Sequence, residues 1–348
     1  MKLFLQIILI LIVFFKTGNL LSENNLFTVN NIQLEKKDKT SHNILANQAV
    51  KKGFNQLLTK ILLKEDVDKL SDMKLSSIKQ LVNYYQVSNK YDEEKKDELI
   101  NFSFTFDKDK IHNLFYKKGI SYSEILDKEL YVLPILIKEN EIYIFNNNFF
   151  YQNWNNVYEN YLIEFILPLE NIEIIQRVYR SKNSLININI DDLFKGYLNK
   201  NIALIIIENS NIVEKKIYLK TKIQNKIIAK NLNFKKQNTD QTDFNKKIIT
   251  DLKKEIINLV KSRNLIDIRV PSFINAKLDL NKKSNLVDLH SRMKNIDLIE
   301  NIYVQEFNKD YVNVKIKYLG KLEKIIYQLE RENIKLQLIN DQWVIKTL

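Results

Sequence analysis

Apolar runs in the middle of the chain are the strongest signal in its hydrophobic pattern. They cover residues 130–137, 163–167 and 202–207, and the first and last of them contain no charge. A strand that is covered on both faces has such a continuous apolar run, whereas apolar and polar residues alternate in a half-exposed strand. Segments with helical spacing separate the runs. The pattern therefore predicts a central α/β domain over residues 128–265, built on a mostly parallel sheet with helices.

Residues 23–127 show a different pattern, in which one strand and one long helix precede a hairpin. Apolar positions spaced by three and four predict a helix that Thr40 or Ser41 caps and that ends near Leu63. Residues 82–91 and 99–106 predict the two hairpin strands. Apolar and polar residues alternate in the second of them, so one face is expected to be buried. These features predict a small N-terminal α+β domain.

Residues 266–348 give the most legible order of elements. Strand, helix, hairpin, helix and strand follow one another, and a further short strand ends the chain. This βαββαβ order predicts a ferredoxin-like C-terminal domain. The expected fold class is thus α+β / α/β in three small units. On the outward face of the strand Tyr311–Tyr318, Asn313, Lys315 and Lys317 accompany one aromatic residue, Tyr311, which is a poor platform for stacking RNA bases.

The first 22 residues have the pattern of a signal peptide. Lys2 precedes an apolar segment, Leu3–Phe15, and a polar approach to Ser22. This segment is shorter than the roughly 20 residues of a membrane span. We expect cleavage near Ser22 and export to the periplasm, with an uncleaved anchor in the inner membrane as the alternative. The chain has no Cys, so no disulfides are expected.

The positive charge of the chain is concentrated in one segment. Residues 209–263 carry 14 basic and 5 acidic side chains, a sum of +9 within a formal net charge of +12. Alternation along two neighbouring strands predicts an exposed basic strip there. Its members are Lys216, Tyr218, Lys220, Lys222, Lys226 and Lys230. The strip is expected either to be a solvated lysine face or to contact anionic lipid or a cell-wall polymer.

Residues with catalytic potential are scattered along the sequence. His42, His112 and His290 lie in different predicted domains, and none has the spacing of metal ligands. Paired acidic residues such as Asp107/Asp109 and Asp191/Asp192 stand at expected helix starts, where carboxylates usually cap the helix. No cofactor, metal or catalytic residue is therefore predicted, and no nucleic acid is expected as a partner of an exported protein.

Several packing motifs resemble a family of exported envelope proteins of Gram-negative bacteria, defined by a domain of unknown function. The matching residues lie in the first helix, the second hairpin strand, the first apolar run and the start of the last domain. They are Ala46, Ala49, Phe54, Leu57-Leu58, Phe102 to Asp107, Val132-Leu133-Pro134, Trp154 and Arg269-Val270-Pro271. The resemblance covers nearly all of the chain after the signal, and it implies an envelope location without assigned catalytic residues.

Three functions are consistent with these features. The first is a non-catalytic binding or assembly module of the cell envelope, with another envelope protein as its partner. The second is an accessory protein of the membrane surface, held by the uncleaved Leu3–Phe15 segment and the lysine strip. The third is a hydrolase with an unfamiliar site built from scattered carboxylates. The missing catalytic motifs favour the first.

Overall fold

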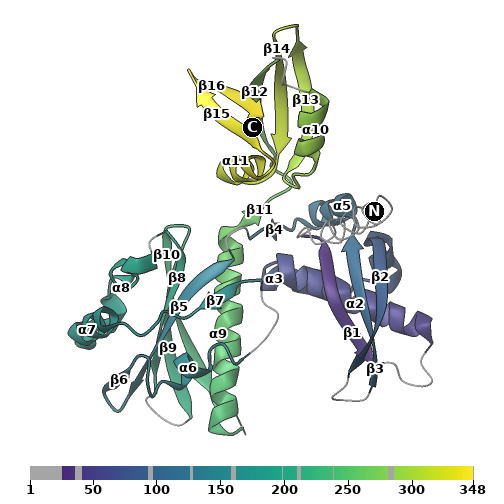
Figure 1. Ribbon diagram of the computed structural model, residues 1–348. Coiled ribbons are helices and arrows are strands. Elements are labelled where there is room, and N and C mark those ends of the chain that lie inside the picture. Colours follow the sequence, from purple (N-terminus) through teal and green to yellow (C-terminus); the bar gives the residue numbers. More distant parts are fainter. Residues whose placement is uncertain are drawn as a thin grey trace, which may run out of the picture. The chain divides into compact units, whose positions relative to one another are not determined.

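The computed structural model describes residues 26–35, 41–92, 97–125, 128–157, 162–197, 199–209, 213–237, 239–280 and 286–347. The predicted signal peptide and anchor segment lie outside these ranges. No helix within them is both long enough and apolar enough to cross a membrane. The chain divides into two compact units between Ile120 and Ser121 (Figure 1).

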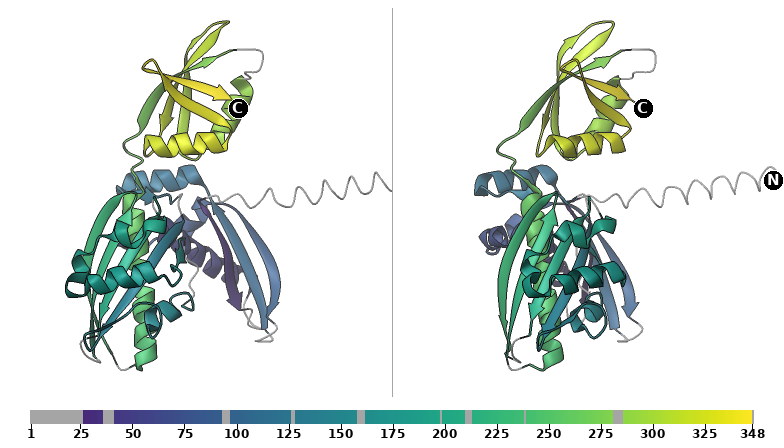
Figure 2. Two further views of the ribbon diagram at one scale, coloured as in Figure 1. Left: turned by 60° about the vertical axis from the view of Figure 1, so that its left-hand side comes forward. Right: turned by 90° about the vertical axis from the view of Figure 1, so that its left-hand side faces the viewer.

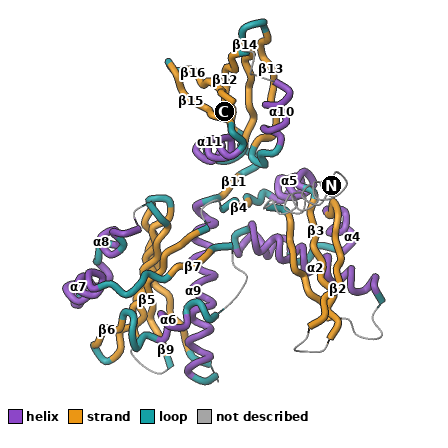
Figure 3. Tube along the Cα trace, viewed as in Figure 1, coloured by secondary structure: helices purple, strands orange, loops and turns teal. Residues whose placement is uncertain are grey.

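The first unit contains a three-stranded antiparallel sheet, which Figure 3 shows in orange. Its strands, in the order β1-β3-β2, are β1 (Thr28–Glu35), β3 (Asp97–Phe106) and β2 (Val82–Asp92). The long helix α2 (His42–Ile61) packs on one face, where the centre of the Phe54 ring lies 5.9 Å from that of the buried Phe106 ring of β3. The other helices are α3 (Lys64–Val67), η1 (Asp68–Leu70), α4 (Leu75–Leu81) and α5 (Lys108–Lys118).

The helix boundaries predicted in this unit are confirmed. The Ser41 hydroxyl accepts a hydrogen bond from the Ile44 amide at 3.4 Å, and α2 begins at the next residue after this cap. Asp107 caps α5 in the same way, through the Lys110 amide at 3.1 Å. Gly119 ends α5 with a φ of 64°, in the left-handed region that glycine adopts without a steric penalty.

A six-stranded sheet forms the core of residues 121–263. Its strands are β5 (Glu129–Lys138), β6 (Glu141–Tyr143), β7 (Glu164–Ile166), β8 (Asn201–Glu208), β9 (Glu214–Ile223) and β10 (Lys226–Lys235). Helices α6 (Phe149–Asn153) and α9 (Gln241–Arg263) cover one face. The other face is covered by α7 (Ile172–Arg180), η2 (Lys182–Asn187), α8 (Ile190–Leu193) and η3 (Lys195–Tyr197). The prediction that residues 130–137 and 202–207 are covered on both faces is confirmed.

The α/β character is confirmed, but the prediction of a mostly parallel sheet is wrong. Strand β5 is parallel to β7 and β8, whereas β6, β9 and β10 join by antiparallel pairing. The connections explain this mixture. Two-residue turns at Glu139-Asn140 and Gln224-Asn225 have positive φ at both positions, and such turns join only antiparallel strands.

The last part of the second unit has the predicted βαββαβ order. Its elements are β12 (Ser272–Asp279), α10 (Leu286–Lys294), β13 (Ile299–Phe307), β14 (Tyr311–Tyr318), α11 (Leu322–Arg331), β15 (Ile334–Ile339) and β16 (Gln342–Thr347). The additional strand β16 inserts between β12 and β15 and runs parallel to β12, giving the order β13-β14-β12-β16-β15. A small pair, β4 (Tyr122–Ser123) with β11 (Leu265–Ile266), precedes this domain.

Candidate functional site

Part of the basic strip predicted on β9 is not free at the surface, because two of its lysines bond to the segment that covers this face of the sheet. Lys216, Tyr218, Lys220 and Lys222 share the face that α7 and α8 cover. The Lys220 ammonium donates to the Ile188 carbonyl at 2.9 Å, and Lys222 forms an ion pair with Asp191 at 2.5 Å. Both lysines therefore hold the segment around α8 against the sheet.

The predicted extension of this strip onto β10 is wrong. Lys226 pairs with Ile223 and Lys230 with Leu219, and paired residues of antiparallel strands lie on the same face. Both partners are buried on the α9 face of the sheet, and Lys230 forms an ion pair with Glu255 of α9 at 2.6 Å. Across a two-residue turn, even-numbered residues of one strand pair with odd-numbered residues of the next. The even-numbered Lys226 and Lys230 therefore lie on the face opposite to that of Lys216, Tyr218, Lys220 and Lys222.

Two hollows lie beside α7 in the described structure. One, of about 380 Å³, is lined by Arg177, whose guanidinium donates to the Asp192 carbonyl at 2.6 Å. The other, of about 430 Å³, contains Tyr143, whose hydroxyl donates to Glu141 at 2.7 Å and whose pKa this hydrogen bond raises. These polar groups bond to neighbouring protein groups and so stabilise the local fold.

The C-terminal sheet offers a more developed surface, because its helices cover only one face. Residues Val312, Val314 and Ile316 of β14 are buried under α10 and α11, which Figure 2 shows on one side of the strands. Period-two alternation then directs the intervening side chains to the opposite, open face. From β12 and β14 this open face receives Phe273, Asn275, Lys277, Asp279, Tyr311, Asn313, Lys315 and Lys317.

Aromatic rings and lysines are paired on this open face. The Lys315 ammonium lies 4.6 Å from the centre of the Phe273 ring, and the Lys277 ammonium 4.7 Å from that of Tyr311. Both distances are within the range of cation–π attraction. Phe273 is 50% exposed and Tyr303 of the neighbouring β13 is 44% exposed. The rings are thus presented to solvent and positioned by their neighbours.

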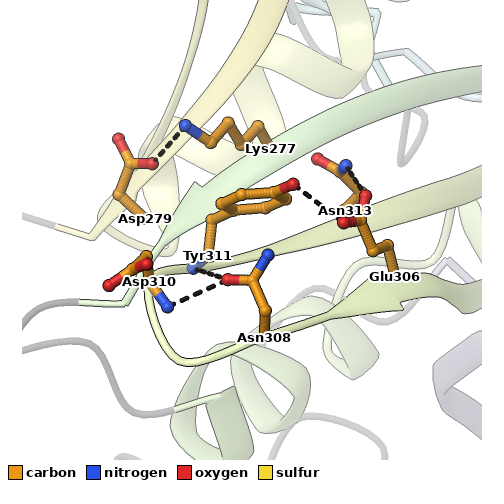
Figure 4. A network of polar contacts seen from close by, with 7 residues as sticks. All are labelled: Lys277, Asp279, Glu306, Asn308, Asp310, Tyr311 and Asn313. Atoms are coloured by element: carbon orange, nitrogen blue, oxygen red, sulfur yellow. Dashed lines mark hydrogen bonds and ion pairs between the residues drawn. The ribbon is translucent and has the colours of Figure 1, made fainter.

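A hydrogen-bonded network fixes one end of the open face (Figure 4). The Tyr311 hydroxyl donates to Glu306 at 2.8 Å, and the Asn313 amide donates to the other oxygen of the same carboxylate at 2.9 Å. This contact with Glu306 is the main cause of the raised pKa of Tyr311. In the adjoining turn Asn308 accepts the amides of Asp310 and Tyr311, both at 2.9 Å. The side chains of this end therefore have few alternative rotamers.

Sequence reasoning found only part of this surface. It placed Tyr311, Asn313, Lys315 and Lys317 outward, and the structure confirms their common face. It missed Phe273, although β12 alternates in the same way and the buried Ile274 puts its neighbour outward. The pairing of Phe273 with Lys315 depends on the register between two strands with a helix and a third strand between them in sequence.

Two buried lysines give the second unit an expected dependence on pH. Burial lowers the pKa of both Lys261 and Lys324 to about 8 from 10.5. Between these values the unfolded chain binds more protons than the folded one, so the free energy of unfolding should rise with pH, by at most about 1.4 kcal/mol per pH unit for each lysine. Urea unfolding at steps from pH 7 to 9.5 measures this rise.

The variant Lys261→Met should remove about half of the rise, whereas Lys246→Met at an exposed position of α9 should leave it unchanged. The measurement should stop below pH 10, because burial raises the pKa of Tyr122 well above 10 and its ionisation in the unfolded chain opposes the trend. A free energy of unfolding that falls between pH 8 and 9.5 in the wild type would contradict the expectation.

A scan of protein-family models gave no match to this chain, and a search of curated proteins gave none either.

Proposed function

We propose that the protein is a non-catalytic binding or assembly module of the cell envelope, and that the open face of its C-terminal sheet contacts a partner protein. The observation that supports this is the half-exposed Phe273 ring under the Lys315 ammonium, on the same open face as Tyr303 and Tyr311. Aromatic residues are enriched where proteins bind one another, and anchors with fixed rotamers lose little entropy on binding.

An envelope location is the second part of the proposal. The apolar Leu3–Phe15 segment and the polar approach to Ser22 support export through a cleaved signal peptide into the periplasm. If the segment stays uncleaved, the same module is held at the inner membrane. In both cases the proposed partner is another envelope protein.

The division of the lysine strip favours a protein partner over a membrane surface. Binding to anionic headgroups is strongest when several lysines face the same way. Here Lys220 and Lys222 are tied to α8, and Lys226 and Lys230 lie on the other face. Neither hollow beside α7 favours a hydrolase, because Arg177 in one and Tyr143 in the other bond to neighbouring protein groups.

Site-specific photocrosslinking in bacterial cells tests the proposed contact. A benzoylphenylalanine at Phe273 should give, on irradiation, a covalent adduct of one discrete mass in the envelope fraction. The same residue at Tyr327 is the matched control, since this ring is 49% exposed on α11 on the helix side of the same sheet. We expect no such adduct there.

A charge reversal at Lys315 adds a second arm to this experiment. Lys315→Glu replaces the cation over the Phe273 ring by a carboxylate, and it should lower the yield of the adduct several-fold. Equal adducts from positions 273 and 327, or none from 273, would show that the open face is not the binding surface.

A further inference from the structure

Strand β2 forms an unprotected edge of the N-terminal sheet. Among the described residues it pairs with β3 on one side only, and this pairing is regular from Tyr84 onward. Residues 84–89, with the sequence YYQVSN, contain no charge, glycine or proline. Unpaired backbone groups along such an edge are a template for another strand.

Helix α2 leaves the apolar face of β2 uncovered. Tyr85 and Val87 pair with Phe104 and Phe102 of β3, so all four side chains lie on the α2 face. The two phenylalanines are buried, whereas Tyr85 is 57% and Val87 49% exposed. The Tyr85 ring stacks on Phe104 with 5.9 Å between the ring centres. The apolar surface of the sheet therefore continues past the helix and ends at solvent.

The other long edges in the described structure carry protective features that residues 84–89 lack. In β2 such features lie only outside this segment, as a register irregularity between Val82 and Tyr84 and as Lys90. Strand β10 has Lys226, Lys230 and Lys235 along its length. Strand β13 contains two register irregularities, and β1 contains one beside Asn31 with a φ of 60°. Lysines and bulges are the usual means of preventing edge-to-edge pairing. Their absence from residues 84–89 indicates an edge that pairs.

We propose that two copies of this chain pair through β2, antiparallel about a two-fold axis at Gln86. In this register Tyr85 of each copy lies opposite Val87 of the other on the α2 face, and Tyr84 lies opposite Ser88 on the other face. With the axis at residue 86, odd-numbered residues of one copy lie opposite odd-numbered residues of the other, so the two residues of each pair lie on the same face of the sheet. The result is one continuous sheet in the order β1-β3-β2-β2-β3-β1.

A second copy suits this edge better than a different protein, because the strand is complementary to itself. Residues 84–89 carry no charge that would select an oppositely charged partner. Residues 23–127, the domain that presents β2, carry 17 basic and 16 acidic side chains, so two copies meet there without strong charge repulsion. An isologous contact also closes the assembly, since each copy uses its only β2 edge.

An introduced thiol tests the register directly, because the chain contains no Cys. Gln86→Cys places two thiols opposite each other, with Cβ atoms about 4.5–5.5 Å apart before adjustment, close to the reach of a disulfide. Oxidation should convert most of this variant to a covalent dimer on a non-reducing gel. Gln305→Cys, exposed on the edge strand β13, is the control and should stay monomeric.

The mass in solution tests the assembly without a crosslink. The chain, purified in the form that cells accumulate, should show the mass of a dimer by light scattering. Val87→Lys should raise the dissociation constant at least 100-fold, because it would place a charged ammonium against Tyr85 of the other copy on the apolar α2 face of the joined sheet. Tyr116→Lys, at an exposed aromatic position of α5 in the same unit, should leave the dimer intact.

Three results would overturn the proposal: a monomeric wild type, a dimer that Val87→Lys leaves unchanged, or equal crosslinking from positions 86 and 305. Crosslinking of the Gln86→Cys variant to another cell protein instead of to itself would likewise overturn it and assign β2 to that protein. None of these readouts involves Phe273, so the dimer and the proposed function fail or succeed separately.

Discussion

Replacing Asn148 by alanine is expected to lower the free energy of unfolding of the central domain by about 3–5 kcal/mol, since several buried backbone groups lose their partner at once. The Asn148 side chain is fully buried, and its hydrogen bonds within the described part of the chain all go to backbone groups. Its amide donates to the carbonyls of Pro134, Tyr143 and Ile144 at 2.8, 3.0 and 2.9 Å, and its oxygen accepts from the amides of Phe150 and Tyr151 at 3.1 and 3.4 Å.

The position of Asn148 explains why no neighbouring group can replace it. Strand β5 pairs with β7 through residues 129–131 and with β6 through residues 136–138. The stretch between these pairings has no strand beside it on that edge in the described structure. Pro134 lies there, and because proline lacks an N–H only its carbonyl needs a partner. Asn148 supplies that partner and also caps α6.

Tryptophan fluorescence during urea unfolding measures this loss, because Trp154 is fully buried in the same domain. Asn146→Ala is the matched control. Asn146 is exposed and makes a single 3.4 Å contact with Glu170, so its loss should change the free energy of unfolding by less than about 0.5 kcal/mol. Similar shifts for the two variants would show that the Asn148 network does not stabilise the domain.

Local signals in the sequence predicted the elements of the fold better than their pairing. The caps at Ser41 and Asp107 depend on bonds within a few residues, and both are confirmed. The alternation in β14 likewise follows from the period of a strand. In contrast, the apolar spacing of residues 149–161 predicts a longer helix than the structure has: α6 ends at Asn153, where Trp154 turns into the core between β5 and α9.

The predictions of candidate surfaces were limited in the same way, because they depend on how strands pair. The length of the turn before β10 decides which face each lysine of β10 occupies. The sequence pattern did not reveal that this turn has two residues, Gln224 and Asn225. The role of Asn148 was hidden in a polar run, NNN, in which its neighbours have different exposures. Contacts between segments distant in sequence, such as that of Phe273 with Lys315, cannot be predicted from the sequence of either segment alone.

Replacing Gly53 by leucine is expected to unfold the N-terminal domain or to destabilise it by more than about 3 kcal/mol, because α2 packs directly on the sheet there. A Cβ atom at Gly53 would lie 2.7 Å from Cδ1 of Ile32 and 3.0 Å from Cδ2 of Phe104. Both neighbours are buried, so neither can move without opening the core. Better helix propensity offsets only about 1 kcal/mol.

The matched control for this variant is Gly196→Leu, since nothing lies within 4 Å of a Cβ built at Gly196. Limited proteolysis with mass spectrometry should show rapid cleavage within residues 42–106 for Gly53→Leu and an unchanged pattern for Gly196→Leu. Wild-type resistance of Gly53→Leu would mean that α2 can lift from the sheet at little cost. Gly53→Leu should unfold β2 and therefore also abolish the proposed dimer. Val87→Lys should abolish the dimer as well, but its proteolytic pattern should remain that of a folded domain. The two variants therefore separate loss of the edge from loss of the sheet that presents it.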